Sequence, residues 1–303
     1  MSYSVTTTLI LSHFYHKIIP MALSNTQNFI NNKELVDKLI DFVDFDVTPT
    51  IIEIGPGKGI ITDTLIKKSK KLIAIESDRN FFLELKNKYK DKNIKLVNDN
   101  FLKFNLPNEP FTVVSNIPFN ITADIIKKLL ASNMQFAYLI MQKEAAIKYL
   151  GVPLAHSPLL SHFIKNEFEI KNLLSIDRKN YTPKPNFDTS FILFSRRKKP
   201  IFSNKQELMF KDFLTYTFER RHAELGKALK QVMSSLQIKV MCKELNIEKE
   251  KNIKEIAFEG WVKMFHIFYK HTPQTSKNKI YGKYKKLLED QKGLIKRHRT
   301  YKD

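Results

Sequence analysis

The segment SNIPFNIT (115–122) places an amide, a proline and an aromatic ring directly after the strand-like run FTVV. The side-chain oxygen of Asn116 and a main-chain carbonyl of Ile117 or Pro118 could accept the two hydrogens of an exocyclic amino group. Such a nitrogen is a weak nucleophile because its lone pair is delocalised, and two acceptors would let it pyramidalise toward an electrophile. Proline fixes the local φ and orients the carbonyls. Phe119 could stack on an extruded base and face a neighbouring cation.

A second motif could bind a nucleotide. The sequence EIGPGKG puts three glycines at the junction of a strand and a helix: Gly55, Gly57 and Gly59. Glycines allow a tight turn and a close approach of the ligand to the free amides of the helix. The dinucleotide fingerprint would require glycine at position 60, which is Ile60, and G-x-G-x-G is instead the spacing of S-adenosylmethionine (SAM) enzymes. Glu76 ends the next strand in AIESD, where a carboxylate can accept hydrogen bonds from both ribose hydroxyls.

Together the two motifs predict methyl transfer from SAM to the amino group of a base. No general base is required, because the nitrogen becomes acidic once it is methylated, so catalysis would rest on proximity and orientation. Taken singly, the glycines could form an ordinary strand-to-helix turn, and the N-I-P-F run could be a turn with a capping Asn and a core Phe. The position of Glu76 relative to the glycines favours the nucleotide interpretation.

Strand-like and helix-like segments alternate over the first two thirds of the chain, which predicts parallel βαβ units and a doubly wound sheet. The expected strands are 50–55, 71–76, 94–99, 111–116 and 136–142, and the expected helices are 31–45, 60–69, 81–90 and 123–130. Two further strand-like segments, 167–176 and 189–197, could close the sheet at one edge.

After SRRKKP (195–200) the pattern becomes helical, with no strand between the helices. The expected helices are 205–221, 225–236, 239–245 and 259–271. The fold class is therefore α/β, with a Rossmann-like SAM-dependent methyltransferase domain and a small C-terminal all-helical domain. The expected division is a leader (1–20), the methyltransferase domain (21–198), a small helical domain (199–271), for which the family resemblance described below implies RNA binding, and a basic tail (272–303).

The charge indicates a polyanionic partner. Lys and Arg number 51 against 31 Asp and Glu, giving a formal net charge of +20. Nucleic acid is favoured over an anionic membrane, and a Lys-rich bias of an AT-rich genome is the alternative. The tail 272–303 holds ten Lys or Arg against three acids and is expected to be disordered when free. The cluster Arg196, Arg197, Lys198 and Lys199 and the tail 272–303 are expected to bind phosphates without reading sequence, and Lys184 is expected to contact the nucleic acid.

Other site classes are disfavoured. The single cysteine, Cys242, cannot form a disulfide framework or a Cys-based metal site, and the histidines lack ligand spacing, so no metal is expected. The first twenty residues have no basic region ahead of a short apolar run, and no targeting signal or membrane span is expected. Met21 opens MALSNTQNF, so translation could start at Met1 or Met21. A cytoplasmic monomer is expected.

Three motifs, EIGPGKG, SNIPFNIT and YTPKPNFDTS, occur here in this order, after TQNFI at 26–30. Over residues 24–270 the chain resembles the ribosomal RNA adenine N6-dimethyltransferases. The resemblance implies SAM as cofactor, RNA as substrate and a helical C-terminal domain. It also implies roles for individual residues: cofactor contacts for Asn28, Ile30, Gly55 and Glu76, the catalytic amide for Asn116, and stacking on the two faces of the target adenine for Phe119 and Tyr181.

The chain departs from the family pattern at two positions. Asn100, with Asp99 before it, stands where the family has an Asp that reads the cofactor's adenine amino group. An amide oxygen can still accept that hydrogen bond. Ser115 replaces the glycine usual before N-I-P-F and is expected to add a side chain close to the methyl donor.

Two branches of the family share these motifs. Erm proteins methylate an adenine of 23S rRNA and confer macrolide, lincosamide and streptogramin resistance, whereas KsgA-like proteins modify adenines near the 3′ end of 16S rRNA. Phe119 in place of Tyr, the missing Y-G-x-L-S run and the basic tail favour the Erm branch, while FERRHAELGKAL (218–229) resembles a KsgA-like helix. A non-catalytic RNA-binding factor on the same fold is the alternative of another class. DNA adenine methylation is disfavoured, because Ile117 stands where those enzymes carry proline.

Overall fold

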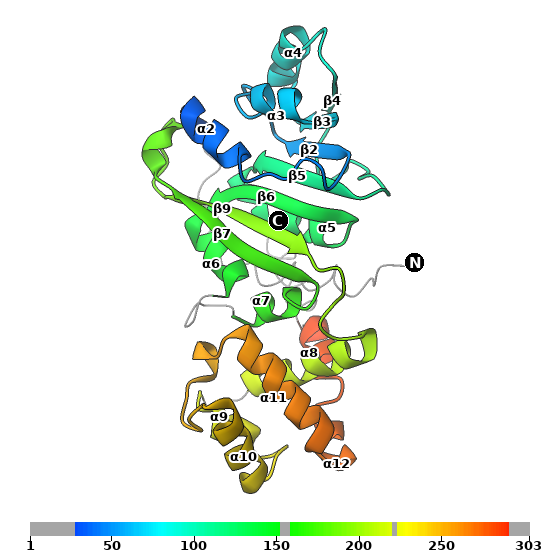
Figure 1. Cartoon of the computed structure of the whole chain (residues 1–303), viewed down its shortest axis with the longest axis vertical. Coiled ribbons are helices and arrows are strands. Elements are labelled where there is room, and N and C mark those ends of the chain that lie inside the picture. The colour runs from blue at the N-terminus through cyan, green and yellow to red at the C-terminus, as the bar shows by residue number, and fades with distance from the viewer. Residues whose placement is uncertain (1–27, 152–157, 220–222, 291–303) are drawn as a thin grey trace, which may run out of the picture. The chain divides into compact units, whose positions relative to one another are not determined.

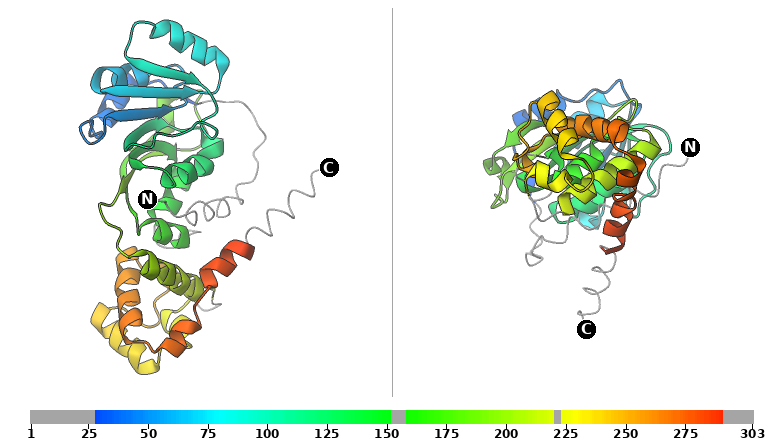
Figure 2. Two further views of the ribbon diagram at one scale, coloured as in Figure 1. Left: turned by 90° about the vertical axis from the view of Figure 1, so that its right-hand side faces the viewer. Right: turned by 90° about the horizontal axis from the view of Figure 1, so that it is seen from below.

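The computed structural model describes residues 28–151, 158–219 and 223–290, and Figure 1 and Figure 2 show the chain from three directions. The described residues fall into two compact units. An α/β unit takes the residues up to 146 together with 168–197, and a helical unit takes 147–167 and the residues from 198 on. The expected leader, the alternative start at Met21 and the last part of the expected tail lie outside the described residues.

Seven strands form the central sheet of the α/β unit, in the order β4-β3-β2-β5-β6-β9-β7 (Figure 1). Their bounds are β2 (Thr50–Ile54), β3 (Lys71–Glu76), β4 (Ile94–Asn98), β5 (Phe111–Asn116), β6 (Met134–Gln142), β7 (Phe168–Ile176) and β9 (Thr189–Arg196). The five strands β4, β3, β2, β5 and β6 are parallel, whereas β9 runs antiparallel to both β6 and β7. The predicted doubly wound sheet and its closing edge are confirmed. The strand order reverses between β2 and β5, which is where such sheets bind ligands.

Four helices pack on this sheet: α2 (Lys33–Ile40), α3 (Thr62–Lys68), α4 (Arg79–Lys88) and α5 (Thr122–Leu130). Two of them begin at capped residues, since Asn32 accepts from the Leu35 amide and Asp78 accepts from the amides of Asn80 and Phe81. A separate pair of short strands, β1 (Phe29–Ile30) and β8 (Tyr181–Thr182), is antiparallel. It joins the two ends of the α/β unit's sequence, which no local pattern predicts.

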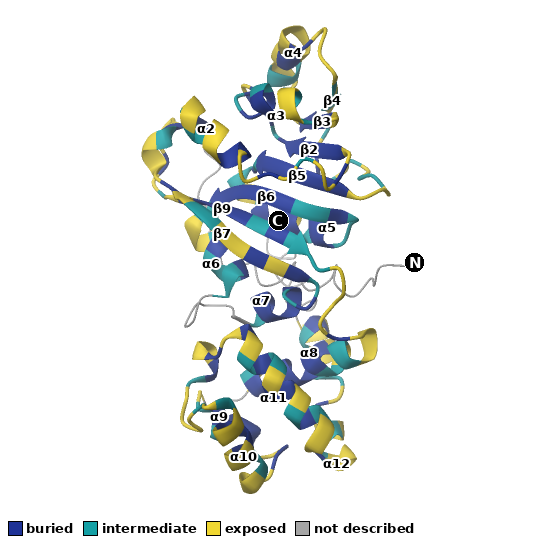
Figure 3. Cartoon of the chain, in the orientation of Figure 1, coloured by how far each residue is buried: buried dark blue, intermediate teal, exposed yellow. Residues whose placement is uncertain are grey.

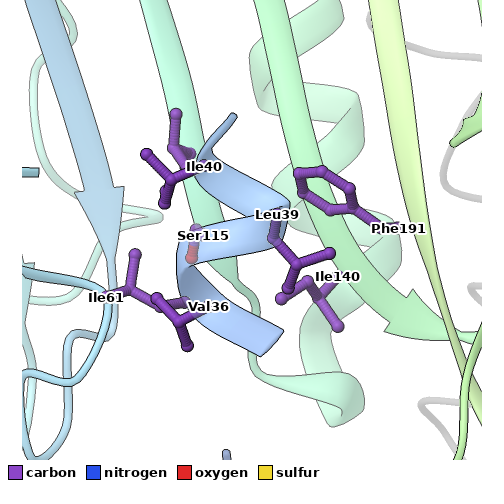
Figure 4. A pocket seen from close by; sticks show the side chains of 8 residues that line it. Val36, Leu39, Ile40, Ile61, Ser115, Ile140 and Phe191 are labelled. Atoms are coloured by element: carbon purple, nitrogen blue, oxygen red, sulfur yellow. The ribbon is translucent and has the colours of Figure 1, made fainter. Parts of the chain in front are cut away.

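Helix α2 presents Val36, Leu39 and Ile40 to the sheet, and a small apolar pocket remains beneath them (Figure 4). Ser115 lines this pocket and is 1% exposed. Its hydroxyl donates to the Ile54 carbonyl at 2.5 Å, which satisfies it within the packing of β2 against β5. The expected closeness of Ser115 to the methyl donor stays a prediction, and the structure adds that its side chain is buried beside the residue that precedes Gly55.

The helical unit is built around aromatic side chains. Its helices are α7 (Pro158–Ile164), α8 (Asn204–Glu219), α9 (Leu225–Leu229), α10 (Ser235–Leu245), α11 (Phe258–His271) and α12 (Gln274–Asn278), and the division between the units falls within α6 (Lys143–Leu150). Rings of α8 and α11 pack together, as in the pair Phe213 and Phe268 with centroids 4.8 Å apart. Figure 3 shows α11 with buried and exposed sides, as expected for an amphipathic helix, whereas residues 210–217 of α8 are buried on all sides.

The helical unit differs from the prediction in three respects. The expected helix 225–236 ends at Leu229, and α10 begins after a capping box in which the side chains of Ser234 and Gln237 each accept from the other's amide. Residues 147–167, with α7, belong to this unit although they precede the last strands of the sheet. Asn166 shows why, since its side-chain oxygen accepts from the Phe202 amide at 2.8 Å.

The third difference concerns the expected basic tail. Ile280, Tyr284 and Leu288 are buried. The buried carboxylate of Asp212 accepts from the amides of Gly282 at 3.1 Å and Tyr284 at 2.8 Å. The segment 272–290 is thus part of the helical core, and the expectation of a disordered tail is wrong as far as residue 290.

No helix within the described residues is both long enough and apolar enough to cross a membrane.

Candidate functional site

The predicted site residues converge where the strand order reverses. Because β2, β3 and β5 are parallel, their carboxyl ends meet at one edge of the sheet. Gly55 follows β2, Glu76 ends β3 and Asn116 ends β5. The sheet therefore brings together side chains that lie up to 61 residues apart, as the hydrogen bond between Ser115 and Ile54 also shows.

The three glycines have different neighbours. All have positive φ, at 63° for Gly55, 55° for Gly57 and 81° for Gly59, which favours glycine. A Cβ on Gly57 would lie 2.6 Å from the ring of Phe29, and one on Gly59 would lie 2.5 Å from the Tyr89 hydroxyl. Gly59 thus admits the packing of α4.

Gly55 borders the catalytic motif. A Cβ there would lie 3.6 Å from Cγ of Pro118, an ordinary contact distance. The glycine turn after β2 and the turn after β5 therefore pass side by side. Of the three glycines, Gly55 is the one whose missing side chain leaves space next to the N-I-P-F segment.

The carboxylate of Glu76 is buried and oriented by the turn. One oxygen accepts from the Gly57 amide at 3.0 Å and the other from the Asp78 amide at 2.9 Å. Each carboxylate oxygen can accept a second hydrogen bond. The turn therefore fixes the orientation of the Glu76 carboxylate and leaves each of its oxygens able to accept one more hydrogen bond, and the predicted contact with ribose hydroxyls stays a prediction.

A second buried acid, Glu53, lies on β2 one residue before Ile54 and was not singled out from the sequence. Burial raises its pKa to about 8, although a hydrogen bond from the Thr62 hydroxyl, 2.7 Å long, opposes that rise. The carboxyl group is thus protonated at neutral pH. Its place at the head of the EIGPGKG motif was the signal that could have identified it.

Asn116 has an acceptor without a donor. Its Nδ2 donates to the Asn28 carbonyl at 3.3 Å. Its Oδ1 is buried and has no hydrogen-bond partner in the described part of the chain. Buried acceptors are nearly always paired, so an unpaired one at a strand end indicates a ligand position.

The sequence left two main-chain carbonyls, those of Ile117 and Pro118, as candidates for the second acceptor of the amino group, and the structure favours one of them. The Pro118 carbonyl accepts from the Ile121 amide at 3.3 Å and from the Thr122 hydroxyl at 3.4 Å. These bonds close the short 3-10 turn of Phe119–Ile121. Of the two carbonyls considered from the sequence, that of Ile117 is the better placed to accept from a substrate.

The aromatic residues correct one prediction. Tyr181 is 2% exposed, and its hydroxyl is 2.7 Å from that of Thr189. Burial raises the pKa of Tyr181. A ring buried in the core cannot cover the face of a base, so the role expected for Tyr181 is wrong in this conformation. The half-buried ring of Phe119 instead contacts Phe187, with centroids 5.2 Å apart.

The remaining cofactor predictions fall on two segments. Ile30 is 4% exposed and lies in the core, so only its backbone could contact a cofactor. Asn100 is exposed, and its side-chain oxygen accepts from the Leu102 amide at 2.8 Å. The loop after Asn100 is held by Lys128, whose ammonium donates to three carbonyls: those of Phe101 at 2.6 Å, Leu102 at 3.0 Å and Phe104. Burial lowers the pKa of Lys128, which the sequence did not single out.

Arg196 does not have the expected role in RNA binding. Its guanidinium donates to three carbonyls, those of Met134 at 3.0 Å, Ser132 at 2.8 Å and Leu130 at 3.3 Å. It also lies over the Phe168 ring at 4.3 Å. These contacts join α5 to the sheet, so the expectation that Arg196 binds phosphate is wrong. Lys184 is exposed and Arg197 partly so, and their contacts with RNA stay predictions.

The residues present fit SAM. The glycine turn lies next to a buried acid with acceptor capacity, and an unpaired amide oxygen stands at the end of the neighbouring strand. In the described part of the chain, no three His, Cys, Asp or Glu side chains gather so as to hold a metal ion.

Known proteins resemble this chain in sequence and in fold. Residues 22–270 match the model of the family described as ribosomal RNA adenine dimethylase. A Bacillus licheniformis protein named rRNA adenine N-6-methyltransferase is 29% identical over 84% of this chain and 91% of its own length. A Mycoplasma mobile protein named ribosomal RNA small subunit methyltransferase A is 30% identical over 79% of this chain and 95% of its own length.

Among solved structures, the 23S rRNA methyltransferase ErmE matches with a TM-score of 0.74 and 21% identity, over 80% of this chain and all of ErmE. This likeness confirms the Rossmann-like methyltransferase fold with C-terminal helices. The family match covers most of the chain, including the glycine turn and the N-I-P-F segment. The chain therefore belongs to the ribosomal RNA adenine dimethylase family, enzymes that use SAM to methylate adenine in ribosomal RNA.

Proposed function

We propose that this protein methylates N6 of one adenine in 23S rRNA, and so confers resistance to macrolides, lincosamides and streptogramins. The observation that carries the amino-group chemistry is the buried, unpaired Oδ1 of Asn116 beside the glycine turn. This oxygen accepts no hydrogen bond from the described residues, and an adenine amino group could donate one to it.

The residues have distinct parts in the reaction. SAM, when bound, supplies an electrophilic methyl group. The Glu76 carboxylate would hold the ribose hydroxyls, and the Asn116 oxygen with the Ile117 carbonyl would accept the two amino hydrogens of the adenine. With both hydrogens held, the nitrogen lone pair turns out of the ring plane, and orientation accounts for most of the rate. The proton leaves to solvent after methylation, without a general base.

The choice of 23S rRNA rests on the sequence. Phe119 replaces the Tyr usual in KsgA-like proteins, and the Y-G-x-L-S run typical of them is missing. The second candidate is 16S rRNA, because the Mycoplasma mobile relative at 30% identity is named a small subunit methyltransferase. Whichever of the two RNAs is the substrate, we propose that the protein acts as a monomer.

Methyl transfer from labelled SAM tests both candidates. Protein-free 23S rRNA, protein-free 16S rRNA and small ribosomal subunits that lack the modification would be incubated separately with the protein. We expect label in 23S rRNA alone. Reverse transcription then locates the adenine, because dimethylation leaves N6 without the N–H that base pairing requires and stops the polymerase, whereas monomethylation leaves one N–H.

Two outcomes would contradict the proposal. Label confined to 16S rRNA or to small subunits would establish the KsgA-like function. RNA binding without label in any substrate would establish a non-catalytic factor.

A susceptible bacterium that expresses the protein should tolerate more erythromycin than one that expresses Asn116→Ala.

A further inference from the structure

Two half-buried phenylalanine rings meet directly beside the catalytic motif. Phe119 lies in the 3-10 turn after Pro118, and Phe187 lies in the segment between β8 and β9. Their ring centroids are 5.2 Å apart and their planes are inclined at 84°, an edge-to-face contact. Both rings keep part of their surface exposed.

The segment that carries Phe187 is fixed on both sides. The Asp188 carboxylate accepts from the Arg178 amide at 3.2 Å, and the Asp188 carbonyl accepts from the Lys143 amide at 3.0 Å. Pro185 is buried on the other side. The backbone next to Phe187 is therefore anchored, and its ring presents a defined surface to Phe119.

The aromatic expected to assist Phe119 is unavailable, because Tyr181 is buried in the core. Phe187 is the aromatic that the structure places against Phe119. An edge-to-face contact restricts the tilt of both rings, since the electropositive ring edge prefers the electronegative ring face. The orientation of Phe119 in the free protein thus depends on Phe187.

We propose that Phe187 is a positioning residue for adenine methylation, which acts by holding the ring of Phe119 in the plane on which the target base stacks. The inference rests on the proposed function, because it takes Phe119 to be the residue that stacks. It assigns Phe187 a role through Phe119 and not through contact with SAM.

The test is a double-mutant cycle measured with the rRNA that the wild-type protein methylates. Phe187→Leu keeps an apolar side chain but removes the ring edge. We expect kcat/KM for the rRNA to fall about 5-fold, which corresponds to the usual strength of such aromatic pairs. The affinity for SAM, measured by calorimetry, should be unchanged, and Phe187→Tyr should restore most of the activity.

The decisive comparison is made in the Phe119→Leu background. If Phe187 acts through Phe119, adding Phe187→Leu should there cause no further loss. Additive losses, or a loss of SAM affinity in Phe187→Leu, would overturn the inference. Phe42→Leu is the matched control, because it removes another edge-to-face contact of the α/β unit, with Phe191, and should leave kcat/KM unchanged.

Failure of the inference can be told from failure of the proposed function. A wild-type protein that methylates no rRNA refutes both. Methylation by the wild type together with full activity of Phe187→Leu refutes only the role of Phe187. Thermal unfolding of each variant shows whether a lost activity reflects a lost fold.

Discussion

The α/β unit and the helical unit place their buried polar groups differently. In the α/β unit these groups gather at the carboxyl ends of the strands, where Glu53 and Glu76 are hydrogen-bonded and the Asn116 oxygen awaits a partner. In the helical unit, His162 and Trp261 have ring nitrogens without partners among the described residues, surrounded by aromatic rings. Burial without a hydrogen bond costs free energy in both. Only in the α/β unit is there a reason for this cost, because the unpaired oxygen of Asn116 lies beside the glycine turn at which the family binds SAM.

The comparison is tested most strongly at Asn116. Asn116→Ala removes the unpaired oxygen and should slow methyl transfer about 1,000-fold, the loss typical of an oriented polar group at the reacting atoms. SAM affinity should stay within a few-fold. Single-turnover transfer of labelled methyl groups and calorimetry measure the two quantities. Asn93→Ala, on the exposed side of the same unit, is the control, and turnover retained in Asn116→Ala would end the assigned role.

Glu53 should make the α/β unit sensitive to alkali. Burial raises the pKa of its carboxyl group from the usual 4.5 to about 8 in the folded chain. Above pH 4.5 the unfolded chain releases a proton that the folded chain keeps, so stability falls as the pH rises toward 8. Glu53→Gln should remove this dependence, which we expect to be about 4 kcal/mol between pH 5 and pH 8.5.

Urea unfolding followed by far-UV circular dichroism at both pH values measures the Glu53 effect. Glu84→Gln, at an exposed glutamate of α4, is the matched control. The same slope with pH in Glu53→Gln and wild type would show that Glu53 is ionised in the folded state.

Asp212 should matter for stability and not for chemistry. Asp212→Ala leaves the amides of Gly282 and Tyr284 without their acceptor and should destabilise the helical unit by about 2 kcal/mol. Trp261 is the single tryptophan and lies in this unit, so its fluorescence follows this unfolding. Glu289→Ala, which removes an exposed ion pair with Lys285, should have almost no effect. Equal stability of the two variants would contradict the described packing of 280–290.

His162 should make the helical unit sensitive to acid. Burial, with Lys165 nearby, lowers its pKa from 6.5 to about 3. Below pH 6.5 the unfolded chain takes up a proton that the folded chain excludes, so stability falls as the pH falls. His162→Phe should reduce the loss between pH 7.5 and pH 5.5 by about 1 kcal/mol.

Trp261 fluorescence in urea measures the His162 effect, with the exposed His266→Phe as the control. Acid sensitivity retained in His162→Phe would place its origin elsewhere. We expect opposite pH responses of the two units, since the α/β unit should lose stability toward alkali and the helical unit toward acid.

The sequence predicted the sheet and the position of the site because both depend on local patterns. Apolar runs bounded by glycines and polar residues marked the strands, and parallel pairing then required Gly55, Glu76 and Asn116 to share one edge. The strand pairing of β1 with β8 is different, since it joins distant residues through two residue pairs. That pairing buries Tyr181, which is why its predicted role was wrong.

Charge was a poor guide to individual basic residues. Arg196 belongs to a basic run, yet its guanidinium is used by three carbonyls of the same unit. The segment 272–290 looks like a basic tail, but its apolar residues Ile280, Tyr284 and Leu288 have a helical spacing that proved decisive. A count of charges cannot detect this helical spacing. The positions of the apolar residues alone would have predicted an ordered helix here.

The short strand β1 couples the start of the described chain to the ligand edge. The ring of Phe29, in β1, occupies the space where a side chain at Gly57 would lie. The carbonyl of the preceding residue, Asn28, accepts a hydrogen bond from the side-chain amide of Asn116. A strand joined by two residue pairs can open locally at far lower cost than the seven-stranded sheet. Occupation of the glycine turn should therefore protect the amides of residues 29–31 from hydrogen exchange well before it changes the melting of the whole protein.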